Sequence, residues 1–264
     1  MSENKFEFPT EVVDLPSKGL GYPEGHPLKK GNIEIKYMTA REEDILASQS
    51  LIRKGVVLDK LFESVVVEPG VDINDIFIGD KNAILLATRV LGYGSEYKVE
   101  ITDPSTLEEQ EVTIDLSKVK TKDFNEELLN SENLYKFKLP KSGTELGFKL
   151  LTHGDEIEIT KENQALARLY KGKGDTTFDV TTRLKYMIQS VDGNEDRGFI
   201  TKWVSNSFLA LDTKAFRKYV REISPDMDLK FNFVSELTGE EEVLDIPFGA
   251  GFFYPSEWLL DSIT

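Results

Sequence analysis

Cysteine is absent from the sequence, and this absence removes several kinds of chemistry together. Without thiols the chain forms no disulfide bond, has no thiolate nucleophile and offers no thiolate ligand to a metal ion. This composition is consistent with a reducing compartment, so we expect the protein to work in a cytoplasm.

Histidine is almost as scarce, because His26 and His153 are the only two in 264 residues. His26 lies in a segment rich in Pro and Gly, and His153 stands beside Gly154 at a predicted helix start. Neither belongs to a recognisable Ser–Asp pattern, and we interpret both as solvated or packing residues. The chain also lacks a G-x-x-x-x-G-K-[ST] phosphate loop, a G-x-G-x-x-G turn after a strand and an H-E-x-x-H motif. We therefore predict no catalytic residue and no cofactor.

One segment, DGNEDRG, invites comparison with a calcium loop, because Asp192, Asn194 and Asp196 alternate along it. Such a loop also requires Gly at its sixth position and a bidentate Glu at its twelfth. Those positions hold Arg197 and Trp203. The segment is better interpreted as a polar turn between helices, and we predict no metal site.

Positive charge is in deficit, since 32 Lys and Arg face 47 Asp and Glu, for a net charge of −15. A surface this acidic repels phosphate backbones and anionic lipid headgroups. The sequence has no run of about 18 apolar residues that would span a membrane. Its first residues, MSENKFEFPTEVV, lack the basic-then-apolar pattern of a signal peptide. We therefore expect no nucleic-acid partner, no membrane partner and no export.

Apolar residues are plentiful, at 39% of the chain with 10% aromatic, which is enough for a sizeable core. Thr39 followed by Glu42 predicts a capping box at a helix start. A short helix and then a longer one, opened by Asp80 and closed by Gly92, are predicted before two alternating runs that indicate a β-hairpin. In the second half, helical stretches are predicted at ITKENQALARLYKG, VTTRLKYMIQSV and DTKAFRKYVREI, followed by a second alternating pair, DLKFNFV and EEVLDIPFG. The fold class predicted is α+β.

The turn LPSKG at 15–19 returns as LPKSG at 139–143, which suggests that the whole module occurs twice. A shift of 132 residues without a gap aligns the end of each half, including both strands of the hairpin. The pairs include Ile84 with Phe216, Arg89 with Arg221, Tyr97 with Leu229, Val99 with Phe231, Ile101 with Phe233, Val112 with Leu244 and Ile114 with Ile246. A slip of one residue would reverse every side chain, so a match that keeps both inward faces favours tandem duplication. Two unrelated helix-and-hairpin units are the alternative.

On this interpretation the chain has two similar α+β modules, each with an extended arm, several helices and an antiparallel hairpin. The predicted ranges are an extended N-terminal arm at 1–32, a first module at 33–117, a linker at 118–133, a second module at 134–249 and an apolar C-terminal tail at 250–264.

The two ends of the chain are the candidate contact elements. The tail, GAGFFYPSEWLLDSIT, is unusually apolar for a terminus. It is either tucked into the core of the chain itself or presented to a partner as an anchor. The predicted partner-binding residues are Leu15, Tyr22, Phe252, Phe253, Tyr254, Trp258, Leu259 and Leu260.

Several ordered stretches between about Leu15 and Leu116 closely resemble one protein family of contractile-tailed phages. They are LPSKGLGYPEGHPL, IEIKYMTAREEDIL, IRKGVVLDKLFESVVV and IGDKNAILLATRVLGYG. The family is that of the baseplate hub subunits or hub assembly proteins of T-even-like phages. Some relatives have a Cys pair at the tip of the first hairpin, where this chain has TDPSTLEEQ, so no metal role carries over.

The resemblance implies a non-enzymatic role in building the central hub of the baseplate, with no small-molecule substrate and no catalytic residue to transfer. It implies partners among other hub or tail proteins. The expected location is the cytoplasm of the infected bacterial host during assembly, with the virion tail baseplate as the alternative. A chaperone-like mechanism would cover an apolar surface or strand edge of a hub component until its neighbour arrives.

Two other classes of function stay open. An acidic DNA mimic that binds a host nucleic-acid-binding protein would need carboxylates in rows at phosphate-like spacing. Here Asp and Glu are interspersed with Lys and Arg, which is typical of an ordinary surface. An enzyme of unrecognised type is the third hypothesis. Salt separates the first two, because binding of a mimic weakens steeply with ionic strength and a mainly apolar contact does not.

Overall fold

The structure is a computed structural model, and it describes residues 8–170 and 179–253. In the first half the elements are β1 (Thr10–Asp14), β2 (Asn32–Lys36), α1 (Ala40–Ala47), α2 (Gln49–Lys54), α3 (Val57–Val65), α4 (Ile78–Tyr93), β3 (Glu96–Thr102) and β4 (Glu109–Asp115). In the second half they are β5 (Tyr135–Lys138), β6 (Glu145–Phe148), α5 (His153–Leu169), α6 (Asp179–Met187), β7 (Ile188–Val191), α7 (Arg197–Asn206), α8 (Ala210–Ile223), β8 (Lys230–Val234) and β9 (Glu241–Asp245). The predicted α+β class is confirmed.

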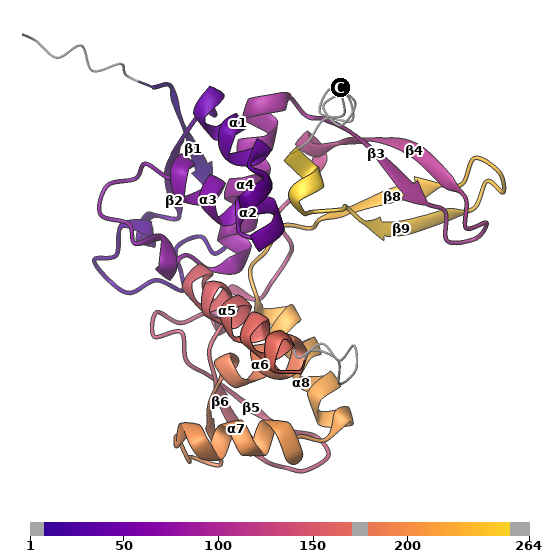
Figure 1. Cartoon of the computed structure of the whole chain (residues 1–264). Coiled ribbons are helices and arrows are strands. Elements are labelled where there is room, and N and C mark those ends of the chain that lie inside the picture. The colour runs from indigo at the N-terminus through magenta and orange to yellow at the C-terminus, as the bar shows by residue number, and fades with distance from the viewer. Residues whose placement is uncertain (1–7, 171–178, 254–264) are drawn as a thin grey trace, which may run out of the picture.

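The strands form small antiparallel sheets, β1–β2, β3–β4, β5–β6–β7 and β8–β9, in the part of the chain that the structure describes. Figure 1 shows α1 to α4 above, α5 to α8 below, and the two hairpins β3–β4 and β8–β9 side by side at the right. We call these two paired hairpins the arm. Hydrogen bonds join their tips, so the arm is one unit although its halves lie far apart in the sequence.

Local expectations were met unevenly. The capping box is present, because the Glu42 carboxylate accepts the Thr39 N–H at 2.8 Å. The helix predicted from Asp80 to Gly92 begins earlier, at Ile78, and its C-cap is Gly94. The last residues of VTTRLKYMIQSV form β7 rather than helix, because they pair with β6. Helix α7 was not predicted.

The repeated turn occupies the same place in both halves. Leu15 and Leu139 are 3% and 1% exposed, and each directly follows the first strand of its half. Gly19 and Gly143 close the two turns with φ of 76° and 75°, a left-handed conformation that favours glycine. The two turns therefore share their burial and their backbone conformation.

In each half, a backbone N–H of the turn donates a hydrogen bond to a buried aspartate, which is the third residue of a helix. The Ser17 N–H donates to Asp80 Oδ1 at 2.9 Å, and the Lys141 N–H donates to Asp212 Oδ1 at 2.7 Å. Both aspartates are fully buried, and they lie 132 residues apart. The same contact thus fastens the turn to α4 in one half and to α8 in the other.

Each half also repeats a lysine, a threonine and a carboxylate where a strand leads into a helix. In both cases the carboxylate accepts the threonine N–H and the lysine ammonium group. The residues are Lys36, Thr39 and Glu42 in the first half and Lys149, Thr152 and Asp155 in the second. The carboxylate satisfies an otherwise free N–H at the helix start and neutralises the lysine.

The hairpin tips share a turn as well. The Asp103 N–H donates to the Glu108 carbonyl at 2.8 Å, and the Ser235 N–H donates to the Glu240 carbonyl at 2.9 Å. The two tips meet where the Ser235 hydroxyl donates to Asp103 Oδ2 at 2.5 Å. These shared turns, caps and contacts support tandem duplication, which stays a prediction.

The segments that follow the two hairpins cross to the opposite half. After β4, Thr121 forms a β-bridge with Met227 of the second half. After β9, the 3₁₀ turn Ala250–Phe253 lies against the first half, where Arg89 Nε donates to the Phe252 carbonyl at 2.9 Å. A connected group of buried apolar residues accordingly extends through both halves. The domain boundaries stay a prediction.

Candidate functional site

The two halves of the chain meet where α4 and α5 begin. Phe77, just before α4, forms an antiparallel β-bridge with Thr152, just before α5. The His153 N–H donates to the Ile76 carbonyl at 2.8 Å. The starts of the two helices are therefore joined through the backbone.

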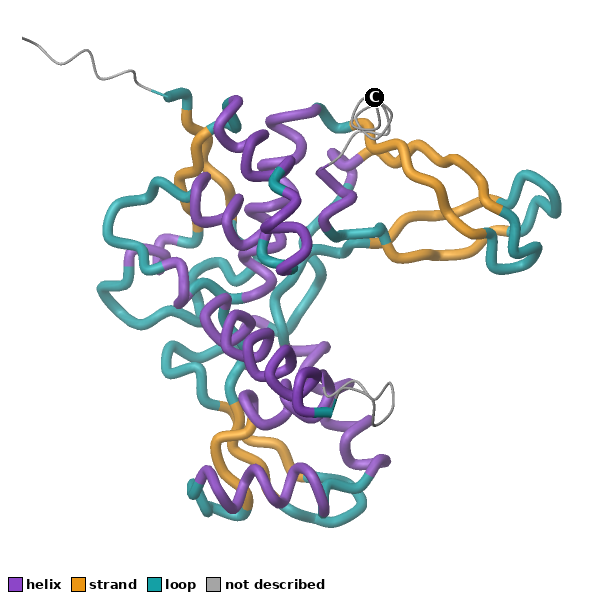
Figure 2. Tube along the Cα trace, viewed as in Figure 1, coloured by secondary structure: helices purple, strands orange, loops and turns teal. Residues whose placement is uncertain are grey.

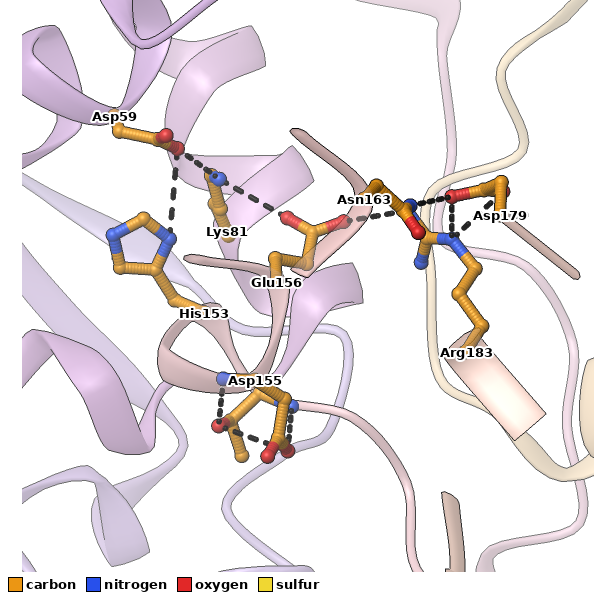
Figure 3. A network of polar contacts seen from close by, with 9 residues as sticks. Asp59, Lys81, His153, Asp155, Glu156, Asn163, Asp179 and Arg183 are labelled. Carbon is orange, nitrogen blue, oxygen red and sulfur yellow. Dashed lines mark hydrogen bonds and ion pairs between the residues drawn. The ribbon is translucent and has the colours of Figure 1, made fainter. Parts of the chain in front are cut away.

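A chain of charged side chains crosses this junction (Figure 3). The ammonium group of Lys81 on α4 lies 2.9 Å from Asp59 of α3 and 3.2 Å from Glu156 of α5. Glu156 in turn lies 3.4 Å from Arg183 of α6, which pairs with Asp179 at 3.3 Å. Lys81 is 6% exposed, and the two carboxylates that flank its ammonium group come one from each half.

His153 lies beside this network but does not complete it. Its ring is fully buried and packs edge-on against Phe62, with ring centres 4.8 Å apart. Nδ1 is 3.8 Å from Asp59, and neither ring nitrogen has a hydrogen-bond partner among the residues that the structure describes. Burial and the neighbouring Lys81 lower the pKa of His153, so the ring is neutral at pH 7. In the described part of the chain His153 therefore acts as a packing residue, with its ring against Phe62.

A second buried polar group holds the loop between β1 and β2. The Asp80 carboxylate accepts the Ser17 N–H at 2.9 Å, the Ser17 hydroxyl at 2.7 Å and the Tyr22 hydroxyl at 2.7 Å. The Tyr22 oxygen accepts the Phe77 N–H at 3.1 Å. Burial raises the pKa of Asp80 to about 6, although the hydrogen bonds from Ser17 and Tyr22 oppose that shift. The N-terminal loop is thus bound to the start of α4 by a carboxylate with a raised pKa.

Because the pKa of Asp80 is raised in the folded protein, the free energy of unfolding should depend on pH through this carboxylate. The folded pKa of Asp80, about 6, exceeds the ordinary value of 3.8, so the pH-dependent part of the stability that Asp80 contributes is present below about pH 4 and lost as pH rises through 6. The hydrogen bonds from Ser17 and Tyr22 to the carboxylate remain at pH 7. Asp80→Asn cannot titrate. We expect its free energy of unfolding, relative to wild type, to rise by about 2–3 kcal/mol between pH 4 and 7. Urea titrations across this range measure it.

Glu42→Gln is the matched control, because the pKa of Glu42 is lowered in the folded protein whereas that of Asp80 is raised. Burial opposes the shift, but hydrogen bonds from Lys36, Ser64 and Thr39 outweigh it and lower the pKa of Glu42 to about 2. The stabilising contribution of Glu42 is therefore present above its ordinary value of 4.5 and lost as pH falls toward 2. Parallel stability curves for wild type and Asp80→Asn between pH 4 and 7 would contradict the assignment.

The structure places four of the predicted partner-binding residues inside the chain. Leu15 and Tyr22 are 3% and 2% exposed, and Phe252 and Phe253 are each 1% exposed. The tail was expected either to pack into the core of the chain or to contact a partner, and Phe252 and Phe253 pack into the core. Tyr254, Trp258, Leu259 and Leu260 lie outside the described residues. Contact of these eight residues with a partner stays a prediction, and the four described side chains are covered by the chain itself.

The other segments weighed from the sequence have structural roles. His26 Nδ1 accepts the Leu28 N–H at 3.2 Å, and its ring stacks on Tyr22. In DGNEDRG, Asp196 caps α7 by accepting the Phe199 N–H at 2.7 Å. Within 8–170 and 179–253, no group of three or more His, Asp or Glu side chains is placed to hold a metal ion. None of the helices in these ranges combines the length and apolar content needed to cross a membrane.

Neither the Lys81 network nor the buried Asp80 was predicted from the sequence. A signal for Asp80 was present, because the shift of 132 residues also pairs it with Asp212. No comparable signal exists for Lys81, whose partners Asp59 and Glu156 lie in different halves.

Comparison with protein families places the chain in a family of phage proteins. The family described as T4 bacteriophage base plate protein matches residues 10–253, from the first residue of β1 to the last residue of the 3₁₀ turn after β9. The chain belongs to this family. The match includes both halves of the baseplate protein and the two segments that cross between them. Comparisons with curated proteins and with solved structures found no match.

Membership in this family makes the protein a phage tail baseplate component, whose partners are other proteins of the phage tail. A structural role in the baseplate is what such a family favours. The family description does not name the hub, so a place in the hub belongs to the proposal that follows.

Proposed function

We propose that this baseplate protein is a non-enzymatic hub subunit or hub assembly factor that acts through protein–protein contacts. The observation that carries the proposal is the arm, which extends away from the helical body (Figure 2). At its tips Leu107 and Leu237 are 78% and 66% exposed. Large apolar side chains at the end of a projecting element are typical anchors for a partner protein.

The strands of the arm are suited to that role for a second reason. Each hairpin forms its own two-stranded sheet, so its outer strand edges carry backbone groups that another strand can pair with. One face of β3–β4 is apolar and faces inward, whereas the other carries the cross-strand pairs Glu96 with Asp115 and Glu100 with Glu111. These carboxylates would repel the carboxylates of a second copy of the arm, which disfavours pairing between two arms. The arm therefore favours a partner of different charge.

The arm gives a test of the proposal. We expect Leu107→Asn with Leu237→Asn to weaken binding to a hub or tail-tube protein of the same phage by at least about tenfold, because two apolar anchors are lost. Co-expression of the tagged full chain with these proteins, affinity pull-down and native mass spectrometry measure the complex. Leu134→Asn, a change at a leucine that is 50% exposed and lies outside the arm, should leave the complex intact.

Two outcomes would overturn the proposal. One is the absence of any complex with a phage tail protein. The other is capture of a host nucleic-acid-binding protein by the wild-type chain with steep salt dependence, which would favour the acidic DNA mimic. Deletion of residues 1–32 is unsuitable as a test, because it removes Ser17 and Tyr22 from the buried Asp80.

A further inference from the structure

Helix α8 carries a stripe of positive charge on one face of an otherwise acidic chain. The stripe, which we call the basic stripe, comprises Lys214, Arg217, Lys218 and Arg221. Their spacing of three and four residues places them on one face of the helix. Lys218 lies 3.6 Å from Glu222, and both of these side chains are largely exposed, so the pair is weak. Among the described residues, the other three cations make no ion pair.

The basic stripe borders a groove of about 980 Å³ formed by α6, α7 and α8. The apolar lining includes Val180, Leu184, Val204, Phe208 and Leu211, together with two alanines. Leu211 and Val180 are 67% and 44% exposed, so apolar surface is available to a ligand. No Asp or Glu is among the described lining residues. The groove thus combines an apolar floor with a basic wall, in which Lys214, Arg217 and Arg221 make no ion pair among the described residues. Asp179 lines the adjoining pocket that Arg217 and Arg221 also border.

The equivalent face of α4 in the first half differs from the α8 face, because most of it is buried. The four residues 132 positions earlier are Asn82, Leu85, Leu86 and Arg89. Leu85, Leu86 and Arg89 are 2%, 6% and 4% exposed, and the chain covers Arg89 with Phe252. In the first half this helix face is largely buried by the chain itself, whereas in the second half it is basic and open. Among the residues that the structure describes, no segment covers the α8 face, so this face is open to a partner.

We propose that the α8 groove binds an acidic amphipathic segment of another tail protein. Its apolar side chains would occupy the floor between α6 and α7, and its carboxylates would pair with the basic stripe. Arg217 and Arg221 offer planar guanidinium groups that bind carboxylates through two parallel hydrogen bonds. Charge complementarity decides the choice of occupant, because a chain of net charge −15 gathers four cations on this one face. The source of the partner rests on the proposed function.

The experiment combines charge reversal with crosslinking of the full-length protein in its co-expressed complex. We expect Lys214→Glu with Arg217→Glu to weaken the complex by at least about tenfold at physiological salt. The matched control, Lys185→Glu with Lys202→Glu, makes the same change in net charge on α6 and α7 and should alter affinity by less than about twofold. Equal urea midpoints for both variants would show that folding is preserved.

A carbodiimide that joins amines to carboxylates without a spacer identifies what the stripe touches. The expected products link Lys214 or Lys218 to Asp or Glu of the tail protein. Links solely to residues 254–264 of this chain, or solely between two copies of it, would overturn the proposal and assign the groove to those occupants. Equal loss of affinity in the reversal and control variants would also overturn it.

A labelled helical peptide with leucines on one face and glutamates on the other separates this inference from the proposed function. Binding of the peptide to the wild-type chain, weakened by the Lys214 and Arg217 reversal, would support the groove even if no phage protein formed a complex. A hub complex that forms normally with the reversal variant would sustain the proposed function and reject the groove.

Discussion

Gly79→Ala is expected to destabilise this baseplate protein by about 3 kcal/mol, the upper end of the usual range for an overpacked site, although it adds one methyl group. Gly79 is the second residue of α4, and its Cα faces the Pro225 segment of the other half. A Cβ there would overlap the Pro225 carbonyl oxygen and lie within 2.8 Å of its carbonyl carbon and 2.9 Å of the Asp226 Cα. Backbone atoms cannot rotate away as a side chain can, so the two halves would have to separate.

That separation would also affect neighbouring contacts. Asn82 donates to Asp226 at 3.0 Å across the same junction. We therefore expect the variant to lose cooperativity as well as stability, measured by urea unfolding followed with both circular dichroism and tryptophan fluorescence. Noncoincident transitions would indicate that the halves unfold separately.

Gly198→Ala is the matched control, because Gly198 is the second residue of α7. An added Cβ would have as its near neighbour the Asp196 Oδ1 atom at 3.3 Å. Since alanine favours the helix over glycine, this change should alter stability by less than about 1 kcal/mol in either direction. Similar effects of the two substitutions would show that the contact of Gly79 with Pro225 does not limit stability.

Asp80→Ala is the second large effect, with an expected loss of roughly 3–5 kcal/mol at pH 7. The substitution leaves the Ser17 N–H, the Ser17 hydroxyl and the Tyr22 hydroxyl without their acceptor in a site that is fully closed to solvent. An unsatisfied buried donor costs about 1–3 kcal/mol, and the removed side chain also leaves a void. Thermal and urea unfolding of the full chain measure the loss.

Asp80→Asn serves as the comparison, because its oxygen can still accept the Ser17 N–H. It should lose markedly less stability than Asp80→Ala, and it removes the cost of burying a charge. Tyr22→Phe, which deletes one of the three donors to Asp80 and the acceptor of the Phe77 N–H, should fall between the two. Equal effects of the alanine and asparagine variants would exclude hydrogen bonding as the main contribution of Asp80.

The hairpins show how much of the fold the sequence could predict. In both, alternating apolar residues place one face inward, and the structure confirms the antiparallel pairing of β3 with β4 and of β8 with β9. The Thr39–Glu42 cap was equally accessible, because its partners are three residues apart. Patterns that act over two to four residues are set by backbone geometry alone. They can therefore be recognised before any tertiary contact is known.

The α6–β7 boundary shows where this approach fails. VTTRLKYMIQSV has helical spacing throughout, yet Ile188–Val191 leaves the helix to pair with β6. A strand partner about 40 residues away outweighs a local helical preference that is worth only tenths of a kcal/mol per residue. The basic stripe on α8 illustrates the same limit, since its spacing is visible in the sequence but its exposure depends on what the rest of the chain covers.

The sequence by itself determined the α+β class, the caps, the hairpins and the scarcity of groups for catalysis, because each depends on composition or on neighbours along the chain. The tertiary structure alone decided that Leu15 and Tyr22 enter the core, that Phe252 covers Arg89, and that α8 keeps an open basic face. The contacts of Tyr22 with Asp80 and of Arg89 with Phe252 join residues 58 and 163 positions apart. Such contacts are selected by the fit of whole surfaces and by the burial of polar groups, which no short sequence pattern specifies.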